Sequence, residues 1–222
     1  MERPQNIKPI HSVRSWYERE ANTVRIVVIF HLVGLIGLYF LATRPYFMHL
    51  VPFHLWLMVL LVLINHDEPD IKFLGFVGIA VSAGWLVEYF GVRTGNLFGD
   101  YAYGNTLGFS IFKIPKLMGI NWFVLTYAAG VSMRKLKIKS MLLRVLSGAA
   151  LLVILDFLIE PIAMRLDYWH WDGNEVPLQN YLCWFITAAA LLLVFELFKF
   201  KKQSMVAPSI LICQFIFFAA LQ

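Results

Sequence analysis

Long apolar runs alternate with short polar segments from about residue 24 onward. A run of about 20 apolar residues is long enough to cross the hydrocarbon core of a bilayer as a helix. The runs predict transmembrane helices at residues 24–42, 50–64, 73–89, 117–132, 141–159, 181–198 and 205–221. The second run is the shortest, and its helix can begin earlier, at Tyr46. We therefore predict an all-α fold, a polytopic membrane bundle of about seven transmembrane helices.

Composition points to the same environment. Apolar residues make up 59% of the 222 residues and charged residues only 15%, a balance that a water-soluble globule rarely reaches. The first apolar run is longer than the core of a signal peptide, so we expect it to remain as a helix. We expect a single integral-membrane helical domain over residues 1–222, in which residues 1–22 form a cytoplasmic arm that is amphipathic or flexible.

Lys and Arg residues lie in short clusters between the apolar runs and give a formal net charge of +5. Such clusters report membrane topology, so no nucleic-acid partner is expected. With alternate loops on opposite faces, one face collects Arg3, Lys8, Arg14, Arg19, Arg25, Lys72, Arg134, Lys135, Lys137, Lys139, Arg144, Lys199, Lys201 and Lys202. The other face keeps Arg44, Arg93, Lys113, Lys116 and Arg165. The positive-inside rule then predicts a multi-pass protein of the cell (inner) membrane with a cytoplasmic N-terminus and an external C-terminus.

Acidic side chains inside apolar runs are costly in lipid and mark candidate functional sites. Glu88 lies near the end of the third predicted helix, one turn after Trp85, so both can share a helical face. Asp156 and Glu160 lie four residues apart in the fifth, which stacks both carboxyls on one face. Pro161 is expected to end or bend that helix. A protonated carboxyl beside a carboxylate is the arrangement that general acid and base chemistry needs.

Other interpretations of these acids stay open. A single acid at a helix end is more often a cap, or the partner of an interfacial arginine such as Arg93 or Arg165. A cluster on one membrane side also suits a proton relay in a transporter. The two cysteines, Cys183 and Cys213, lie inside apolar runs and indicate neither a disulfide framework nor a thiolate metal site. No metal site is expected.

Two loops on the less basic face combine glycines, acids and aromatic residues. The first, residues 88–104, is rich in glycine but lacks the strand-to-helix context and the Lys-Ser/Thr pair of a phosphate-binding loop. The second, residues 168–180, begins with four polar and aromatic side chains, Tyr168, Trp169, His170 and Trp171. An interfacial aromatic belt explains some of these rings. It does not explain the glycines and acids that accompany them.

Several motifs between about residues 73 and 190 carry a family resemblance. They are Glu88 through Thr94-Gly95 and Phe98-Gly99-Asp100-Tyr101 to Tyr103, Ile114-Pro115, Asn121-Trp122, Asp156 to Glu160-Pro161, and Trp169-His170-Trp171 to Asn180 and Trp184. On these motifs the chain resembles the CruF-type carotenoid hydratases, also called carotenoid 1,2-hydratases, bisanhydrobacterioruberin hydratases or carotenoid biosynthesis proteins. The motif around Thr94 is the most specific of them. The cluster Asn65-His66-Asp67-Glu68 has no assigned counterpart.

The resemblance implies a carotenoid-modifying enzyme that adds water to the terminal C=C bond of an acyclic carotenoid end group. Protonation of such an alkene gives a tertiary carbocation, which water captures, and no cofactor is required. The catalytic candidates, with acid and base roles left open, are Asp156, Glu160, Glu88 and Asp100. The candidates that contact the substrate or stabilise the cation are Trp85, Tyr101, Tyr103, Trp122, Trp169 and Trp171. The candidates that hold the water or orient a carboxyl are Asn121, His170 and Asn180.

The expected partners are an acyclic carotenoid and membrane lipid, and association with other carotenoid-pathway enzymes stays open. Two other functions also remain. A carotenoid (lycopene-type) cyclase begins with the same protonation, but a neighbouring double bond captures the cation. A small proton-coupled transporter would use the same acids and needs a polar pathway to both faces. A retinal-binding photoreceptor is excluded, because residues 205–222 contain no lysine for a Schiff base.

Overall fold

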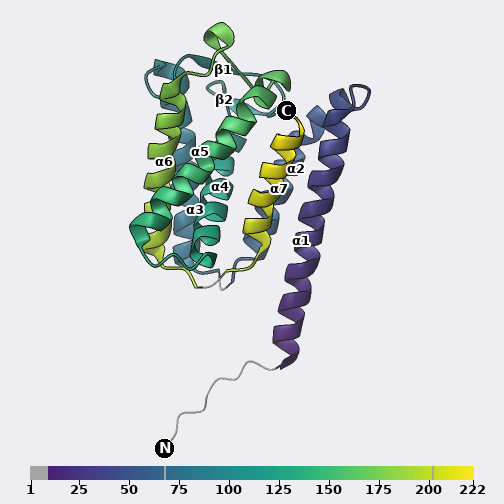
Figure 1. Cartoon of the computed structure of the whole chain (residues 1–222), viewed down its shortest axis with the longest axis vertical. Helices are drawn as coiled ribbons and strands as arrows, with labels where there is room; N and C mark the ends of the chain where they lie inside the picture. The colour runs from purple at the N-terminus through teal and green to yellow at the C-terminus, as the bar shows by residue number, and fades with distance from the viewer. Residues whose placement is uncertain (1–9, 68, 202) are drawn as a thin grey trace, which may run out of the picture.

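The computed structural model describes residues 10–67, 69–201 and 203–222. These residues form seven α-helices that pack into one bundle (Figure 1). The helices are α1 (Ile10–Tyr39), α2 (Arg44–Ile64), α3 (Ile71–Thr94), α4 (Leu117–Lys135), α5 (Met141–Arg165), α6 (Leu178–Phe198) and α7 (Val206–Ala220). The short elements are β1 (Tyr101–Tyr103), β2 (Ser110–Ile111), β3 (Ile114–Pro115), β4 (Trp169–Trp171) and the 3-10 turn η1 (Asp172–Asn174). The predicted all-α fold is confirmed.

Each predicted apolar run corresponds to one of these helices. Within the described residues, five helices are long and apolar enough to cross a membrane, namely α1 from Trp16 onward, α2, α3, α5 and α6. The last helix, α7, is shorter, with 15 residues. Large apolar side chains are exposed on the outer surfaces of the long helices, where lipid and not water is the favourable neighbour. The chain is therefore a membrane protein.

The first helix begins earlier than predicted. Residues 10–22, which we assigned to an arm, belong to α1, and this helix extends past the others at one end of the bundle (Figure 1). The other residues of the predicted arm, 1–9, lie outside the described part of the chain. The chain ends at the opposite end of the bundle, after α7 (Figure 1).

Two helices continue beyond their predicted ends, and this changes the depth of the acids. The third helix, α3, reaches Thr94 and not residue 89, and α5 reaches Arg165 and not residue 159. Pro161 lies inside α5 and does not end it. At about 1.5 Å per residue, Glu88 lies about 9 Å and Glu160 about 8 Å from the last residue of its helix. Both acids are therefore inside the bundle and not at its rim.

The fourth helix occupies the centre of the bundle. Fourteen of its 19 residues are buried. A small residue lets α3 approach it closely, because a Cβ atom on Gly119 would lie 2.4 Å from the carbonyl oxygen of Val81. Small residues at helix contacts serve the same purpose in other membrane bundles. The position of α4 brings its Trp122 side chain between α3 and α6, where the candidate site lies.

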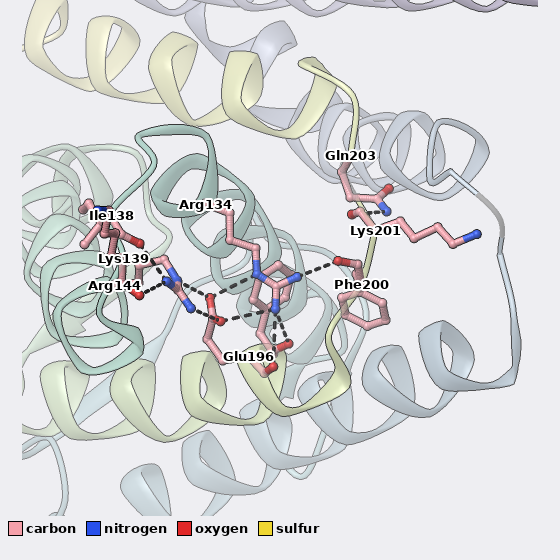
Figure 2. A network of polar contacts seen from close by, with 9 residues as sticks. Arg134, Ile138, Lys139, Arg144, Glu196, Phe200, Lys201 and Gln203 are labelled. Atoms are coloured by element: carbon pink, nitrogen blue, oxygen red, sulfur yellow. Dashed lines mark hydrogen bonds and ion pairs between the residues drawn. The ribbon is translucent and has the colours of Figure 1, made fainter.

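Figure 2 shows an ion-pair network that holds three helices together. It lies at the end of the bundle where α1 begins, since α6 ends there (Figure 1). The Glu196 carboxylate of α6 accepts from Arg134 of α4 at 3.1 Å and from Arg144 of α5 at 2.8 Å. Arg134 also donates to the carbonyl of Phe200, and Arg144 donates to that of Ile138. The network thus joins α4, α5 and α6 to the two connections that follow α4 and α6.

Segment 65–68, left unassigned by the sequence, takes part in a second polar network at this end. The Nδ1 atom of His66 lies 2.7 Å from the hydroxyl of Tyr127. That hydroxyl donates to Oε1 of Gln203, which also accepts from the backbone N–H of Asp67 at 2.9 Å. The last residue of the segment lies outside the described part of the chain. The described part of segment 65–68 therefore links α2 to α4 and to the connection before α7.

Candidate functional site

Two loops at the end of the bundle where the chain finishes meet as an antiparallel ribbon of β1 and β4. The register pairs Tyr101 with Trp171, Ala102 with His170 and Tyr103 with Trp169. Alternate residues of a strand point to opposite faces. The two tyrosines and the two tryptophans therefore share the face that covers the bundle, and Ala102 and His170 are exposed on the other.

The carboxyl group of Glu88 accepts three hydrogen bonds under this ribbon. Tyr101 and Tyr103 donate to its Oε2 atom at 2.6 Å and 2.5 Å. The indole N–H of Trp122 donates to Oε1 at 2.9 Å. An ionised carboxyl group only accepts hydrogen bonds, so these three donors stabilise the carboxylate form of Glu88.

The two phenols stay protonated and able to donate. Burial raises the pKa of Tyr101 and of Tyr103, and the nearby Glu88 carboxylate raises the pKa of each further. Both hydroxyls therefore keep their protons at physiological pH and serve Glu88 as neutral donors.

Glu160 and Asp156 lie on one face of α5 and share a donor from α6. The amide nitrogen of Asn180 donates to Oδ2 of Asp156 at 2.9 Å and to Oε1 of Glu160 at 3.1 Å. The indoles of Trp169 and Trp171 donate to Oε2 of Glu160 at 2.9 Å and 2.7 Å. Glu160 thus receives three donors and Asp156 one. The prediction that these two carboxyls share a helical face is confirmed.

Neutral groups, and not cations, surround these three acids. Within the described residues, no Lys or Arg forms an ion pair with any of them. The guanidinium of Arg93 lies over the ring of Tyr89, and Arg165 donates to the carbonyl of Leu221. Asp156 is fully buried and its Oδ1 atom has no partner among the described residues. Three negative charges in such a place are costly, so the cluster favours retention of a proton.

One cavity is lined by two of these acids, and a second cavity shares part of its wall. The smaller has a volume of about 20 Å³, and its lining includes Glu88 and Glu160. A water molecule needs about 10–15 Å³ of such space, so this cavity has room for one. The larger has a volume of about 440 Å³ and lies between α1, α2, α4 and α7, with mainly apolar walls. Met118, Trp169 and Trp184 line both cavities.

Comparison with known proteins identifies the family. A family model described as carotenoid biosynthesis protein matches residues 46–222. The chain belongs to this family. A bisanhydrobacterioruberin hydratase of Haloarcula japonica is 27% identical over 201 residues, which cover 83% of this chain and 67% of that protein. No solved structure matches the chain significantly.

In this member of the carotenoid biosynthesis family, four predicted site residues lie away from the three acids. Asp100 is exposed in the loop before β1. His170 faces outward and bonds to Asp167 at 2.8 Å. Trp85 stacks on Tyr89 with ring centroids 5.6 Å apart. Asn121 lines the large cavity and does not line the small one.

The helical spacing that suggested Trp85 as a neighbour of Glu88 was misleading. The indole that donates to Glu88 belongs to Trp122, 34 residues further along the chain. Trp122 packs against Trp184 with ring centroids 4.3 Å apart. Sequence reasoning did not single out Met118, whose position on both cavities follows only from how the helices pack.

Proposed function

We propose that this member of the carotenoid biosynthesis family adds water to the terminal C=C bond of an acyclic carotenoid end group. One observation carries the proposal: two of three buried carboxyls without a cationic partner line a one-water cavity, and this cavity shares part of its wall with a large apolar cavity. A bound polyene tip would meet acid, water and aromatic rings together. The name of the Haloarcula relative, a hydratase, supports the same chemistry.

Glu160 is our candidate for the acid. Asp156 and Glu160 share the Asn180 amide, and two adjacent negative charges in lipid are unfavourable, so the pair holds a proton. Glu160 lines the small cavity, whereas Asp156 lines neither cavity. Glu160 therefore delivers the proton that it shares with Asp156, and this adjacent acid is what distinguishes Glu160 from Glu88. The three N–H donors of Glu160 then stabilise the carboxylate that forms.

Glu88 is our candidate for the base. Its carboxylate is held in place by two phenols and an indole, and like Glu160 it lines the small cavity. A carboxylate there also stabilises a nearby cation, as do the faces of Trp169 and Trp184 on the shared wall.

The reaction balances without a cofactor. Glu160 gives its proton to the less substituted alkene carbon, and the π electrons form the new C–H bond. The neighbouring carbon becomes a tertiary cation. The oxygen of water forms the C–O bond with this carbon, and the extra proton of that water passes to Glu88. Return of this proton from Glu88 to Glu160, across the small cavity that both line, restores the starting state.

The small cavity favours hydration over cyclisation. A cyclase must exclude water from the cation, whereas a space of about 20 Å³ between two carboxyls is suited to hold one water molecule. The large cavity has room for an apolar chain, because its volume is about 440 Å³ and its walls, partly formed by α1, α2 and α7, are mainly apolar.

Co-expression with a lycopene-producing pathway, followed by mass analysis of the pigments, tests the proposal. Hydration adds the mass of one water to each modified end, whereas cyclisation leaves the mass unchanged. Glu160→Gln and Asp156→Asn should reduce the hydrated product by about a hundredfold or more. Glu175→Gln, which changes an exposed carboxyl at the same end of the bundle, is the matched control. Unaltered pigments with lycopene and with longer acyclic carotenoids would exclude the hydratase assignment.

We also propose that the end carrying Lys137, Lys139 and Lys199 faces the cytoplasm at the cell membrane. The support is the excess of basic residues in the loops at that end. A membrane-impermeant maleimide applied to intact cells should label a Glu175→Cys variant and leave a Lys139→Cys variant unlabelled. Labelling of the Lys139→Cys variant and not of the Glu175→Cys variant would mean that the protein has the opposite orientation.

A further inference from the structure

The large cavity carries a second set of polar groups, which the proposed hydration does not use. His31 of α1 and Gln214 of α7 line this cavity and are only 5% and 8% exposed. His54 of α2 and Asn121 of α4 line it as well. The rings of His31 and His54 lie edge to face with centroids 4.7 Å apart. Four helices thus each bring a polar side chain to a cavity whose other walls are mainly apolar.

Two acceptor atoms in this set lack a hydrogen-bond donor. Nδ1 of His31 lies 2.8 Å from the carbonyl oxygen of Val27. A carbonyl only accepts, so Nδ1 carries the proton and Nε2 of His31 is an acceptor. Neither Nε2 of His31 nor Oε1 of Gln214 has a partner among the described residues. Buried polar atoms without partners are rare and costly, above all in a bilayer.

We propose that the large cavity binds an acyclic isoprenoid carrying a hydroxyl group, whose O–H donates to His31 or Gln214. The isoprenoid nature of this ligand rests on the proposed function, whereas the need for a donor rests on the two acceptors. A hydrocarbon chain leaves both acceptors unpaired, and an ether oxygen does the same because it only accepts. An alcohol supplies the missing hydrogen-bond donor and requires no change in the apolar walls.

The position of this site across the bundle separates it from the acid cluster. His31 lies eight residues before the end of α1, about 12 Å from that end, and α1 and α7 lie on the far side of the bundle from α3 and α6 (Figure 1). The hydroxyl has two possible sources. The substrate carries an alcohol remote from its reacting tip, or the hydrated product moves back until its new alcohol reaches the acceptors. Both use the same O–H chemistry.

Binding of short isoprenoids to the purified full chain in detergent tests the proposal without measuring hydration. The probes are farnesol, farnesyl methyl ether and the tertiary alcohol obtained by hydrating the terminal double bond of that ether. The readout is the rise of the unfolding temperature with probe concentration, which gives an apparent Kd. One or both alcohols should bind the wild type about tenfold more tightly than the ether. Preference for farnesol indicates a substrate alcohol, and preference for the tertiary alcohol indicates the product.

The His31→Phe and Gln214→Leu double variant should bind alcohol and ether equally. A Leu55→Met variant, changed at an apolar position of the same cavity, should keep the preference. The partition of each probe into detergent is the same for every variant. It therefore cancels when the ratio of the ether Kd to the alcohol Kd is compared between variants. If the double variant does not fold, the preference must fall in at least one single variant. Equal binding of all probes by the wild type, or an unchanged preference in the variants, overturns the proposal whatever the outcome of the hydration assay.

Discussion

The hydroxyl of Tyr103 lies 2.5 Å from Oε2 of Glu88, so a side chain of β1 is bonded to a carboxyl inside α3. Tyr101 donates to the same oxygen at 2.6 Å. Hydrogen bonds to a charged acceptor are stronger than neutral ones, and these two also hold the ribbon of β1 and β4 over the acids. Glu88 is therefore both a candidate base and the anchor of the loop that covers it.

Loss of these phenols should weaken the reaction. Tyr101→Phe and Tyr103→Phe should each lower product formation about tenfold, because each removes one donor that fixes and stabilises the Glu88 carboxylate. The double variant should be slower than either single one. Pigment mass analysis at equal protein level measures the effect. Tyr46→Phe, at an exposed phenol of the same end, serves as the control, and full activity in the double variant would remove Glu88 from the mechanism.

Removal of the shared amide should destabilise the protein. Asn180→Leu leaves Oδ2 of Asp156 and Oε1 of Glu160 without their donor, at a cost of about 1–3 kcal/mol in the free energy of unfolding. The measurement is unfolding in detergent, with the exposed neighbour variant Gln179→Leu as reference. Adding Asp156→Asn to Asn180→Leu should cost less than the sum of the two single changes. Strict additivity would mean that Asp156 does not depend on Asn180.

The ion-pair network at the opposite end should matter for stability and not for chemistry. Glu196→Gln leaves Arg134 and Arg144 without their shared carboxylate, which should lower the free energy of unfolding by about 2–3 kcal/mol. The variant should make less product of unchanged mass. Unfolding in detergent and pigment analysis measure the two effects, with Glu175→Gln as the control. A change in the kind of product would contradict a purely structural role.

Stability should also depend on the protonation of His66. Burial lowers the pKa of His66 from its ordinary value of 6.5 to about 4, so the unfolded chain binds a proton more readily than the folded one. The contribution of His66 is therefore complete above about pH 6.5 and is lost progressively as the pH falls from 6.5 to 4. Unfolding in detergent over this range should show the decline. The His66→Phe variant should lose less stability over the same interval, and an equal decline in both proteins would contradict the prediction.

The helices were predictable because a long apolar run has one main solution in lipid. Their ends were harder to predict, because Arg93 and Arg165 look like loop residues but lie in the last turns of α3 and α5. A basic side chain there interacts favourably with the carboxyl end of a helix. The predicted helices therefore stopped about one and a half turns too early, and the acids appeared closer to the membrane surface than they are.

The acid cluster was only partly predictable. Asp156 and Glu160 are related by helical spacing, which a sequence displays directly. The approach of Glu88 depends on contacts between α3, α4 and the ribbon, which have no local signal. The alternation in Tyr-Ala-Tyr and Trp-His-Trp is a strand pattern, but three residues are too few to identify it. For the same reason His170, in the middle of its triplet, was expected inside the site and lies outside it.

The ribbon has a consequence for biogenesis. One strand follows α3 and the other follows α5, so its two halves leave the ribosome with two helices between them. The two phenols that bond to Glu88 are made soon after α3, so Glu88 can gain them early. Glu160 lacks both indoles until the segment after α5 has been made. A nascent chain that stops before α6 also lacks the Asn180 amide. The full set of hydrogen-bond donors around the three acids can therefore form only after the beginning of α6 has been made.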